Sequence, residues 1–397
     1  MLQYYCYTGT QEGSQVDVIG YVFIIIAFGR ILAEVFERLG YPGFLGEISA
    51  GLILGVALTN LPRSEMSLLA QFGIFFLMIY SGLELTPEEV RLGGRKSFPI
   101  YVITYAVMLF VTLPFTGYSL SYDSLVVAAI LSVASAPIVI TLARFFGKEF
   151  LHIALSYAVI SEVGSLVILY LLINFELHHL SYTGLFLEFV KDILFLGVVL
   201  GLNYVIGIQH KVQIIRALRK LRSDEAVFGV FMILSTSLAL ISEEIGLHFS
   251  IGGFLAGLLL HSDLVGTKQF ERLRTIISGI TYGIFAPIFF AWRGINFETE
   301  FSRDVVYFFV LIYMVRVLLT TLFVWKDDFR SSIVRATGIA SFGVLGLLVG
   351  ELGYEHGILS AHMYALASLA SIMGIFISAT IGRMISYLNE RQNIEIQ

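Results

Sequence analysis

Residues 45–52 of the chain read LGEISAGL, and residues 251–258, about 205 to 210 positions later, read IGGFLAGL. The tripeptide Gly-Ile-Phe also occurs twice, at 73–75 and again at 283–285. Gly, Ala and Leu are common in membrane helices, so one short match of this kind carries little weight. The same spacing, however, relates the starts of six apolar segments in each half: 16, 42, 66, 97, 122 and 150 recur as 224, 248, 271, 303, 331 and 359. The uniform spacing indicates an internal repeat of six helices.

The composition is that of a polytopic membrane protein. Of the 397 residues, 57% are hydrophobic and 14% are charged, and the mean hydropathy of +0.84 is too high for a soluble core inside a polar surface. Apolar segments of spanning length predict an all-α protein with about 13 transmembrane helices. They fall at 16–38, 42–60, 66–83, 97–118, 122–146, 150–173, 183–207, 224–245, 248–262, 271–291, 303–325, 331–352 and 359–387.

The distribution of basic residues predicts the orientation, because cytoplasmic loops are enriched in Lys and Arg. Most of the 25 Lys and Arg residues fall in one set of alternate loops and at the C-terminal end, whereas the other set holds Arg63, Arg293 and Arg303. We therefore expect residues 1–15 outside the cell, a transporter domain over 16–387 in the plasma membrane, and a short cytoplasmic tail over 388–397. The extra helix 183–207 separates repeat one (16–173) from repeat two (224–387), so the second repeat enters the membrane inverted.

Two charged residues lie in the middle of apolar segments, Glu162 within 150–173 and Arg316 within 303–325. An ionised side chain at the bilayer centre costs at least ~2.5–3.5 kcal/mol, so it usually faces protein or water and marks a path for ions or protons. Inverted repeats with such charges are typical of secondary transporters. No Walker loop, nucleophile elbow or metal-binding triad indicates an enzyme or a bound cofactor, and the net charge of −5 gives no reason to expect nucleic-acid binding.

The fifth and twelfth apolar segments carry signals of a helix break at their centres. Residues 132–137 read SVASAP, and Pro137 both removes a backbone hydrogen bond and disfavours helix at the preceding residue. Residues 337–343 read TGIASFG, which are small and flexible at the corresponding depth. Close packing of two continuous helices through small residues is the alternative. Because the segments are repeat mates beside the two mid-membrane charges, the sequence favours interruption, which frees backbone groups as ion ligands.

Four short motifs resemble the monovalent cation/proton antiporter superfamily, which contains the sodium/proton exchangers and their potassium/proton relatives. They read PGFLGE at 42–47, SGLEL at 81–85, GGFLAG at 252–257 and APIFF at 286–290. The resemblance covers nearly the whole chain. It implies a homodimer in which each chain has a scaffold domain and a six-helix core domain with two crossed broken helices. It also implies exchange of a monovalent cation, most of all Na⁺, for H⁺.

The family carries two adjacent acids, or Asn-Asp, after the first broken helix, where this chain has Ser161 and Glu162. The resemblance therefore assigns proton and cation binding to Glu162. Hydroxyls of Ser161, Ser132, Ser135 and Ser341, together with freed carbonyls, would complete an oxygen shell.

With one titrating acid at the midplane, proton and cation compete for a single charge, so exchange is expected to be one-for-one and electroneutral.

The family's basic residue facing this motif falls on Arg316, which stays protonated where a lysine could release its proton. We expect it to compensate the negative ends of the broken helices; a purely structural pair with Glu162 is the alternative. Glu47 and Glu84 lie near helix ends and are candidates for a gate or an entrance for the cation, or for plain solvated acids. Arg30 and Glu34 are spaced to form an i, i+4 pair.

Other functions stay open at this point. The cation is undetermined by sequence, and K⁺ is an alternative to Na⁺. A symporter or uniporter for another solute could use the same fold, with a roomier crossing. Since Ser161 replaces the first acid of the family motif, a non-transporting sensor that has kept the fold is a third possibility.

Overall fold

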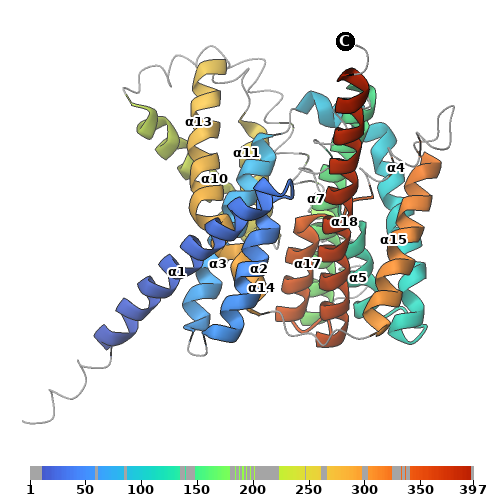
Figure 1. Ribbon diagram of the computed structural model, residues 1–397, viewed down its shortest axis with the longest axis horizontal. Helices are drawn as coiled ribbons and strands as arrows, with labels where there is room; N and C mark the ends of the chain where they lie inside the picture. Colours follow the sequence, from blue (N-terminus) through green and yellow to red (C-terminus); the bar gives the residue numbers. More distant parts are fainter. Residues whose placement is uncertain are drawn as a thin grey trace, which may run out of the picture.

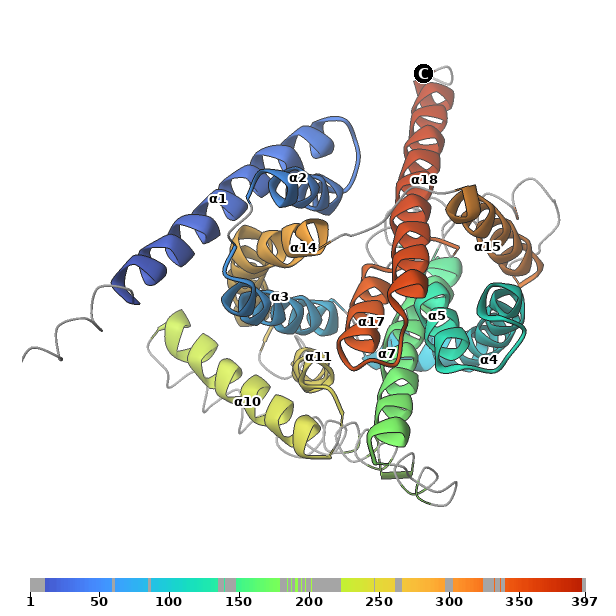
Figure 2. The ribbon, with the colours of Figure 1, turned by 90° about the horizontal axis from the view of Figure 1, so that it is seen from below.

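The computed structural model describes residues 11–58, 61–84, 87–134, 148–178, 223–245, 247–260, 266–296, 303–323 and 340–394, and single positions between 139 and 336. Within these residues the protein is α-helical, apart from short turns and one isolated β-bridge. Its helices form two bundles, seen side by side in Figure 1 and from below in Figure 2. Each bundle takes helices from both halves of the chain, as an inverted-repeat fold requires.

The first bundle, called the scaffold bundle here, has eight elements: α1 (Gln11–Arg38), α2 (Gly43–Ala57), α3 (Arg63–Leu83), α10 (Asp224–Ile245), α11 (Phe249–Leu259), α13 (Thr267–Ile280), the π-helical turn η3 (Thr281–Phe285) and α14 (Ala286–Ile295). The second, the core bundle, contains α4 (Pro87–Thr112), the 3₁₀ turn η1 (Leu113–Thr116), α5 (Tyr122–Ser132), α7 (Lys148–His178), α15 (Arg303–Phe323), α17 (Val344–Glu355) and α18 (Ala361–Ile394). Among the described helices, the closest backbone packing occurs within each bundle, and buried apolar side chains join the two bundles.

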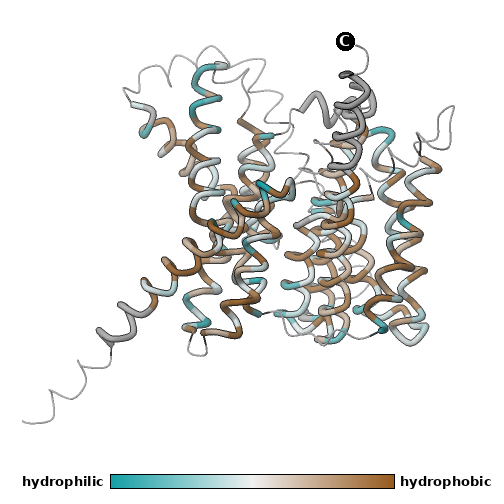
Figure 3. The backbone as a smooth tube through the Cα atoms, in the orientation of Figure 1, coloured by the Kyte–Doolittle hydropathy of each residue, from teal (hydrophilic) through white to brown (hydrophobic). Residues whose placement is uncertain are grey.

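Eight of the described helical segments are long and apolar enough to cross a membrane: Val18–Arg38, Arg63–Leu83, Gly94–Thr116, Ile153–Ile173, Glu225–Ile245, Thr267–Ile295, Arg303–Phe323 and Ala361–Ile381. Shorter apolar helices add α2, α5 and α11. Their apolar surface is visible in Figure 3, where hydrophobic positions run along the outside of both bundles. The predicted linker helix 183–207 and the terminal residues 1–10 and 395–397 lie largely or wholly outside the described residues, so the count of about 13 helices stays a prediction.

Close packing of glycines repeats between the two halves. A side chain on Gly46 of α2 would collide with the Leu32 carbonyl of α1, and a side chain on Gly252 of α11 would collide with the Leu238 carbonyl of α10. The four residues occupy equivalent positions in the two repeats. The recurrence of LGEISAGL as IGGFLAGL therefore reflects the same helix–helix contact made twice, in which only glycine lets the two backbones approach.

The two predicted helix breaks cross in the middle of the core bundle. Helix α5 ends at Ser132, and the extended Val133 leads to Ala134, which forms an antiparallel bridge with Phe342. The Gly343 N–H donates to the Val133 carbonyl at 2.9 Å, and α17 begins at the next residue. The break in α5 thus precedes Pro137, which lies outside the described residues, and the cross-connection between the repeats holds it open.

Candidate cation and proton site

Arg316 of α15 is fully buried beneath the crossing and hydrogen-bonds to main-chain carbonyls. Its guanidinium donates to the carbonyls of Leu131, Ser132 (3.4 Å) and Val133 (2.8 Å) at the end of α5, and to that of Ser341 (3.2 Å) on the other broken segment. A helix leaves its last carbonyls without partners and carries partial negative charge at that end. The permanently charged guanidinium of Arg316 therefore donates hydrogen bonds to main-chain carbonyl oxygens that the helix break leaves without intrahelical partners.

A ring contact adds to this arrangement. The Arg316 guanidinium carbon lies 4.5 Å from the centre of the Phe342 ring, the residue that forms the β-bridge. A cation over an aromatic face is stabilised by the ring quadrupole. The arginine thus contacts both broken segments, and every hydrogen bond that it makes within the described part of the chain goes to a carbonyl.

Ser161 ties the broken helix to α7. Its hydroxyl accepts from the Ala134 N–H at 3.0 Å and donates to the Ala158 carbonyl at 2.7 Å. The Ser132 hydroxyl donates to the Ala128 carbonyl at 2.6 Å inside α5. A hydroxyl has one proton and two lone pairs, so each of these oxygens retains the capacity to accept while it serves the fold.

Glu162 follows Ser161 in the middle of the span Ile153–Ile173 and is 4% exposed. The Ser81 hydroxyl of α3 donates to its carboxylate at 3.4 Å. Ser81 belongs to the scaffold bundle and Glu162 to the core bundle, so this contact crosses the boundary between them. Sequence reasoning quoted Ser81 as part of the SGLEL motif and gave it no role; its position beside the acid is a finding of the structure.

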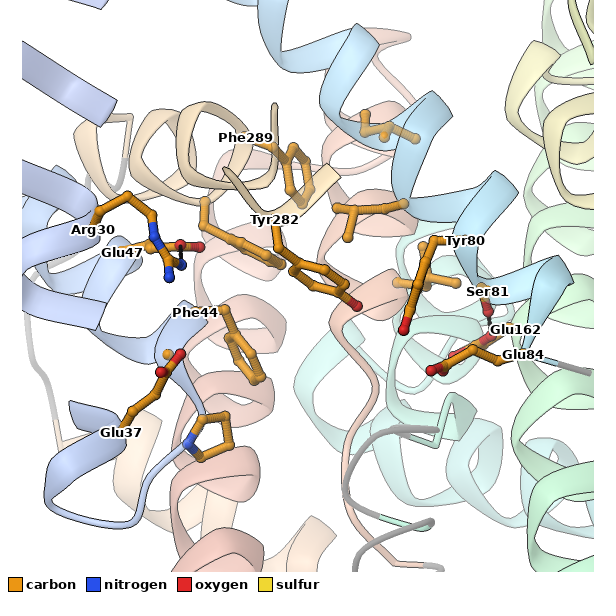
Figure 4. A pocket seen from close by; sticks show the side chains of 16 residues that line it. Arg30, Glu37, Phe44, Glu47, Tyr80, Ser81, Glu84, Glu162, Tyr282 and Phe289 are labelled. Atoms are coloured by element: carbon orange, nitrogen blue, oxygen red, sulfur yellow. Dashed lines mark hydrogen bonds and ion pairs between the residues drawn. The ribbon is translucent and has the colours of Figure 1, made fainter. Parts of the chain in front are cut away.

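A cavity of about 350 Å³ lies between the bundles and reaches Glu162. Its lining includes four carboxylates and one guanidinium, those of Glu37, Glu47, Glu84, Glu162 and Arg30. Figure 4 shows Glu162, Ser81 and Glu84 at one side of this cavity, Arg30 and Glu47 at the other, and the rings of Tyr80 and Tyr282 between them. The volume suffices for on the order of ten waters, and an acidic lining raises the local concentration of cations.

The cavity is lined by Glu37 near the end of α1 and by Glu84 at the end of α3. Helices α3 and α18 both run toward the upper end of the molecule in Figure 1. This end is called the C-terminal face below, and the other end the opposite face. Glu84 caps the end of α3 there and pairs with Arg274 of α13 at 3.3 Å. The Glu84 side chain is partly exposed and lines the same cavity as the buried Glu162.

Arg30 pairs with Glu47, and the predicted pair with Glu34 is wrong. The Arg30 guanidinium lies 3.0 Å from the carboxylate of Glu47, which is 2% exposed, whereas Glu34 pairs with Arg38 at 2.8 Å. Glu34 has an arginine four residues away on either side, Arg30 and Arg38, so either pairing satisfies the i, i+4 spacing of a helix surface. Arg30 instead faces α2, where a buried carboxylate requires a charged partner.

The structure brings most of the predicted site residues together around the crossing and the cavity. Ser161, Ser132, Ser341 and Arg316 surround the crossing, and Glu162 joins it to the cavity that Glu47 and Glu84 also line. Ser135 lies outside the described residues. Sequence reasoning did not identify a further buried ion pair, Arg293 with Glu351, because its members are far apart in the chain and belong to different bundles.

The sequence of the chain is similar to those of several known antiporters. The chain is 22% identical over 376 residues to the Na⁺/H⁺–K⁺ antiporter GerN of Bacillus cereus, covering 90% of this chain and 93% of that protein. It is 26% identical over 284 residues to the probable Na⁺/H⁺ antiporter 3 of Methanocaldococcus jannaschii, covering 69% and 70% of the two chains.

The fold is that of a solved structure, the sodium proton antiporter MjNhaP1 from Methanocaldococcus jannaschii. The TM-score is 0.67 at 16% identity, covering 94% of this chain and 96% of that chain. The transmembrane sodium/hydrogen exchanger family matches residues 23–386, nearly the whole chain. The chain belongs to the sodium/hydrogen exchanger family of membrane proteins.

Proposed function

We propose that this protein exchanges a monovalent cation, Na⁺ in the first instance, for H⁺, with Glu162 as the group that binds each in turn. The observation that carries the proposal is the position of Glu162. It is a buried carboxylate at mid-span, next to the crossing of two broken helices, and it borders an acidic cavity. A carboxylate in this position can be neutralised either by a proton or by a cation.

Oxygen ligands for a bare monovalent cation are close to Glu162. We propose that the hydroxyls of Ser161, Ser132, Ser135 and Ser341 and the free lone pairs of main-chain carbonyls near the crossing complete the shell. Ser81 adds a hydroxyl from the scaffold bundle. Arg316 supports this arrangement by neutralising the carbonyls at the end of α5, so that they hold their positions without a bound ion.

Glu47 and Glu84 are proposed to admit cations to the cavity from the C-terminal face. Their partners, Arg30 and Arg274, lie on other helices, so each pair can open without unfolding a helix. Because Glu162 is the single acid proposed at the crossing, each half of the cycle moves one positive charge, and exchange is one-for-one and electroneutral.

We propose the orientation that the basic loops favour, with the C-terminal face in the cytoplasm and residues 1–15 outside a plasma membrane. We also propose a homodimer. Apolar side chains such as Phe23 and Ile31 on α1 are exposed, which suits contact with lipid and with a second copy through the scaffold bundle. Chemical cross-linking in native membranes tests the dimer.

K⁺ is the second candidate cation, because the name of the Bacillus cereus relative includes K⁺. Reconstitution into liposomes with an internal pH dye decides between the ions. Na⁺, K⁺ and Li⁺ are added in turn outside acid-loaded vesicles. Alkalinisation inside with one ion and not with choline supports exchange and names the substrate. Proteoliposomes whose pH responds to none of the three cations would contradict the proposal.

A further inference from the structure

A second cluster of buried polar groups joins the two bundles near the opposite face. Arg293 of α14 forms an ion pair with Glu351 of α17 and donates to the Tyr364 hydroxyl of α18 at 3.4 Å. The same hydroxyl donates to the Glu351 carboxylate at 2.7 Å. Arg293 belongs to the scaffold bundle, whereas Glu351 and Tyr364 belong to the core bundle. All three groups therefore meet across the boundary that the Ser81–Glu162 contact also crosses.

The cluster is buried, and within the described residues the Arg293 Nε has no hydrogen-bond partner. Arg293 is 7% exposed and Glu351 is 8% exposed, and the guanidinium carbon lies 5.3 Å from the centre of the Phe289 ring. Burial costs both charges their hydration, so the removal of one partner leaves an uncompensated charge in the boundary between the bundles. Buried apolar side chains also join the two bundles, and this cluster adds a charged, directional contact between α14 and the pair α17 and α18.

Its position separates two cavities. Glu351 lies six residues along α17 from Leu345, or ~9 Å at the helical rise, and Leu345 lines the cavity of Glu162. On the other side, Glu351 and Tyr364 line a separate pocket of about 230 Å³, together with Trp292, Asn296 and residues at the rim. That pocket lies at the opposite face, where α14 and α17 end. The cluster stands between the pocket and the central cavity.

We propose that Arg293, Glu351 and Tyr364 form a latch, which closes the path from Glu162 to the opposite face and must open for the core bundle to turn Glu162 toward that face. The proposal rests on the exchange proposed above, in which Glu162 is exposed to each side of the membrane in turn. It assigns these residues a conformational role: they hold the two bundles in the state in which the cavity opens at the C-terminal face, and they take no part in ion binding.

A labelling experiment measures that conformational bias without any ion gradient. Cys6 is the single cysteine of the sequence, so Cys6→Ala gives a cysteine-free background. Leu77→Cys then places a thiol on α3 in the wall of the central cavity. A membrane-impermeant maleimide is applied from the opposite face in intact cells and from the C-terminal face in inside-out vesicles. With the latch intact, we expect rapid labelling from the C-terminal face and slow labelling from the other.

Opening the latch should reverse this preference. Glu351→Gln or Arg293→Gln is expected to raise the labelling rate from the opposite face about tenfold and to lower it from the C-terminal face. Asp304→Asn is the control, because it removes an exposed carboxylate from the same bundle as Glu351, in the first turn of α15, and should leave both rates unchanged. Unchanged rates in folded Glu351→Gln and Arg293→Gln proteins would overturn the latch.

Tyr364→Phe serves if the charge variants aggregate, since it removes only the hydroxyl and keeps the ion pair. It is expected to shift the labelling in the same direction by a smaller factor, and no shift would again count against the latch. Altered labelling in a protein that shows no exchange with any cation would support the latch and refute the proposed transport, so the two failures are distinguishable.

Cross-linking provides the converse test with the latch residues unchanged. Asn296→Cys, directly after α14, and Ala361→Cys, at the start of α18, place two thiols on the wall of the same pocket, one from each bundle. A short, reducible bifunctional thiol reagent should stop exchange, and reductant should restore it, whereas each single cysteine treated alike should stay active. Full exchange by the cross-linked protein would show that the bundles need not separate here.

Discussion

The Ala134 N–H donates to the Ser161 hydroxyl at 3.0 Å, which fastens the broken end of α5 to α7 one residue before Glu162. The serine that replaces the first acid of the family motif thus has a definite structural task. A carboxylate could accept the same hydrogen bond, so the position preserves the acceptor while it gives up the charge. We therefore expect both the stoichiometry of exchange and the stability of the crossing to depend on Ser161.

Ser161→Ala should weaken the crossing. The variant leaves the Ala134 N–H buried without its acceptor, at a cost of about 1–3 kcal/mol. We expect a lower melting temperature in detergent and slower exchange. Ser156→Ala, another buried serine of α7, controls for the loss of any hydroxyl in this helix. A melting temperature equal to that of the unmodified protein would mean that water replaces the hydroxyl.

Arg316→Ala should be among the most destabilising single substitutions. It removes the guanidinium from the Leu131 carbonyl and leaves the Ser132 and Val133 carbonyls with the Tyr157 hydroxyl and the Gly343 N–H as donors, at a cost of about 1–3 kcal/mol for each group left unsatisfied. Arg316→Lys keeps the positive charge but offers fewer hydrogen-bond donors, so we expect electroneutral exchange to persist in a less stable protein. Thermal unfolding compares both with Arg303→Ala, an exposed arginine at the start of the same helix. Equal melting temperatures for Arg316→Ala and Arg303→Ala would show that the Arg316 guanidinium does not stabilise the carbonyls at the end of α5.

Gly252→Ala should disrupt a contact that the repeat makes twice. The added methyl group meets the Leu238 carbonyl, and overpacking of this kind costs about 1–3 kcal/mol. Gly46→Ala should behave alike at the equivalent contact with Leu32. Gly279→Ala is the control, because open space surrounds that glycine in α13, and it should be neutral or slightly stabilising. Equal melting temperatures for all three variants would refute the close approach.

A membrane potential should neither drive nor accelerate exchange. Ser161 carries no charge through the cycle, so one cation replaces one proton on Glu162 and no net charge moves. Valinomycin and K⁺ set the potential across proteoliposomes in which the ion gradients are matched, and the pH dye reports flux. Currents that reverse at a potential set by unequal stoichiometry would contradict one-for-one exchange and indicate a second proton carrier, for which Glu47 in the same cavity is the candidate.

Sequence reasoning predicted the fold well where the signal is local or repeated. The inverted repeat, the two broken segments and the burial of Glu162 and Arg316 follow from spacing, composition and the cost of charge in a bilayer. The break in α5 begins earlier than Pro137 suggests, since a cross-connection from Gly343 and the hydroxyl of Ser161 decide it. Such tertiary partners override local propensity.

Ion-pair partners between distant helices were the part that sequence could not supply. Arg30 has acids available at more than one position, and the choice of Glu47 depends on how α1 rotates against α2. The pair between Arg293 and Glu351 depends on how the two bundles meet. The rotation of α1 and the contact between the bundles do not produce a periodic pattern in one sequence. A single charged residue near a helix end is equally compatible with a solvated surface.

Cation-dependent proton flux in Glu162→Gln proteoliposomes tests the central claim most directly. Glutamine keeps the shape of the side chain and can neither release a proton nor neutralise a cation. Glu176→Gln, an exposed acid farther along α7, is the matched control, and both proteins are checked for folding by gel filtration. We predict that the Glu176 variant exchanges normally and that the Glu162 variant shows no cation-dependent pH change. Exchange retained by a folded Glu162→Gln protein would contradict the assignment of the shared site.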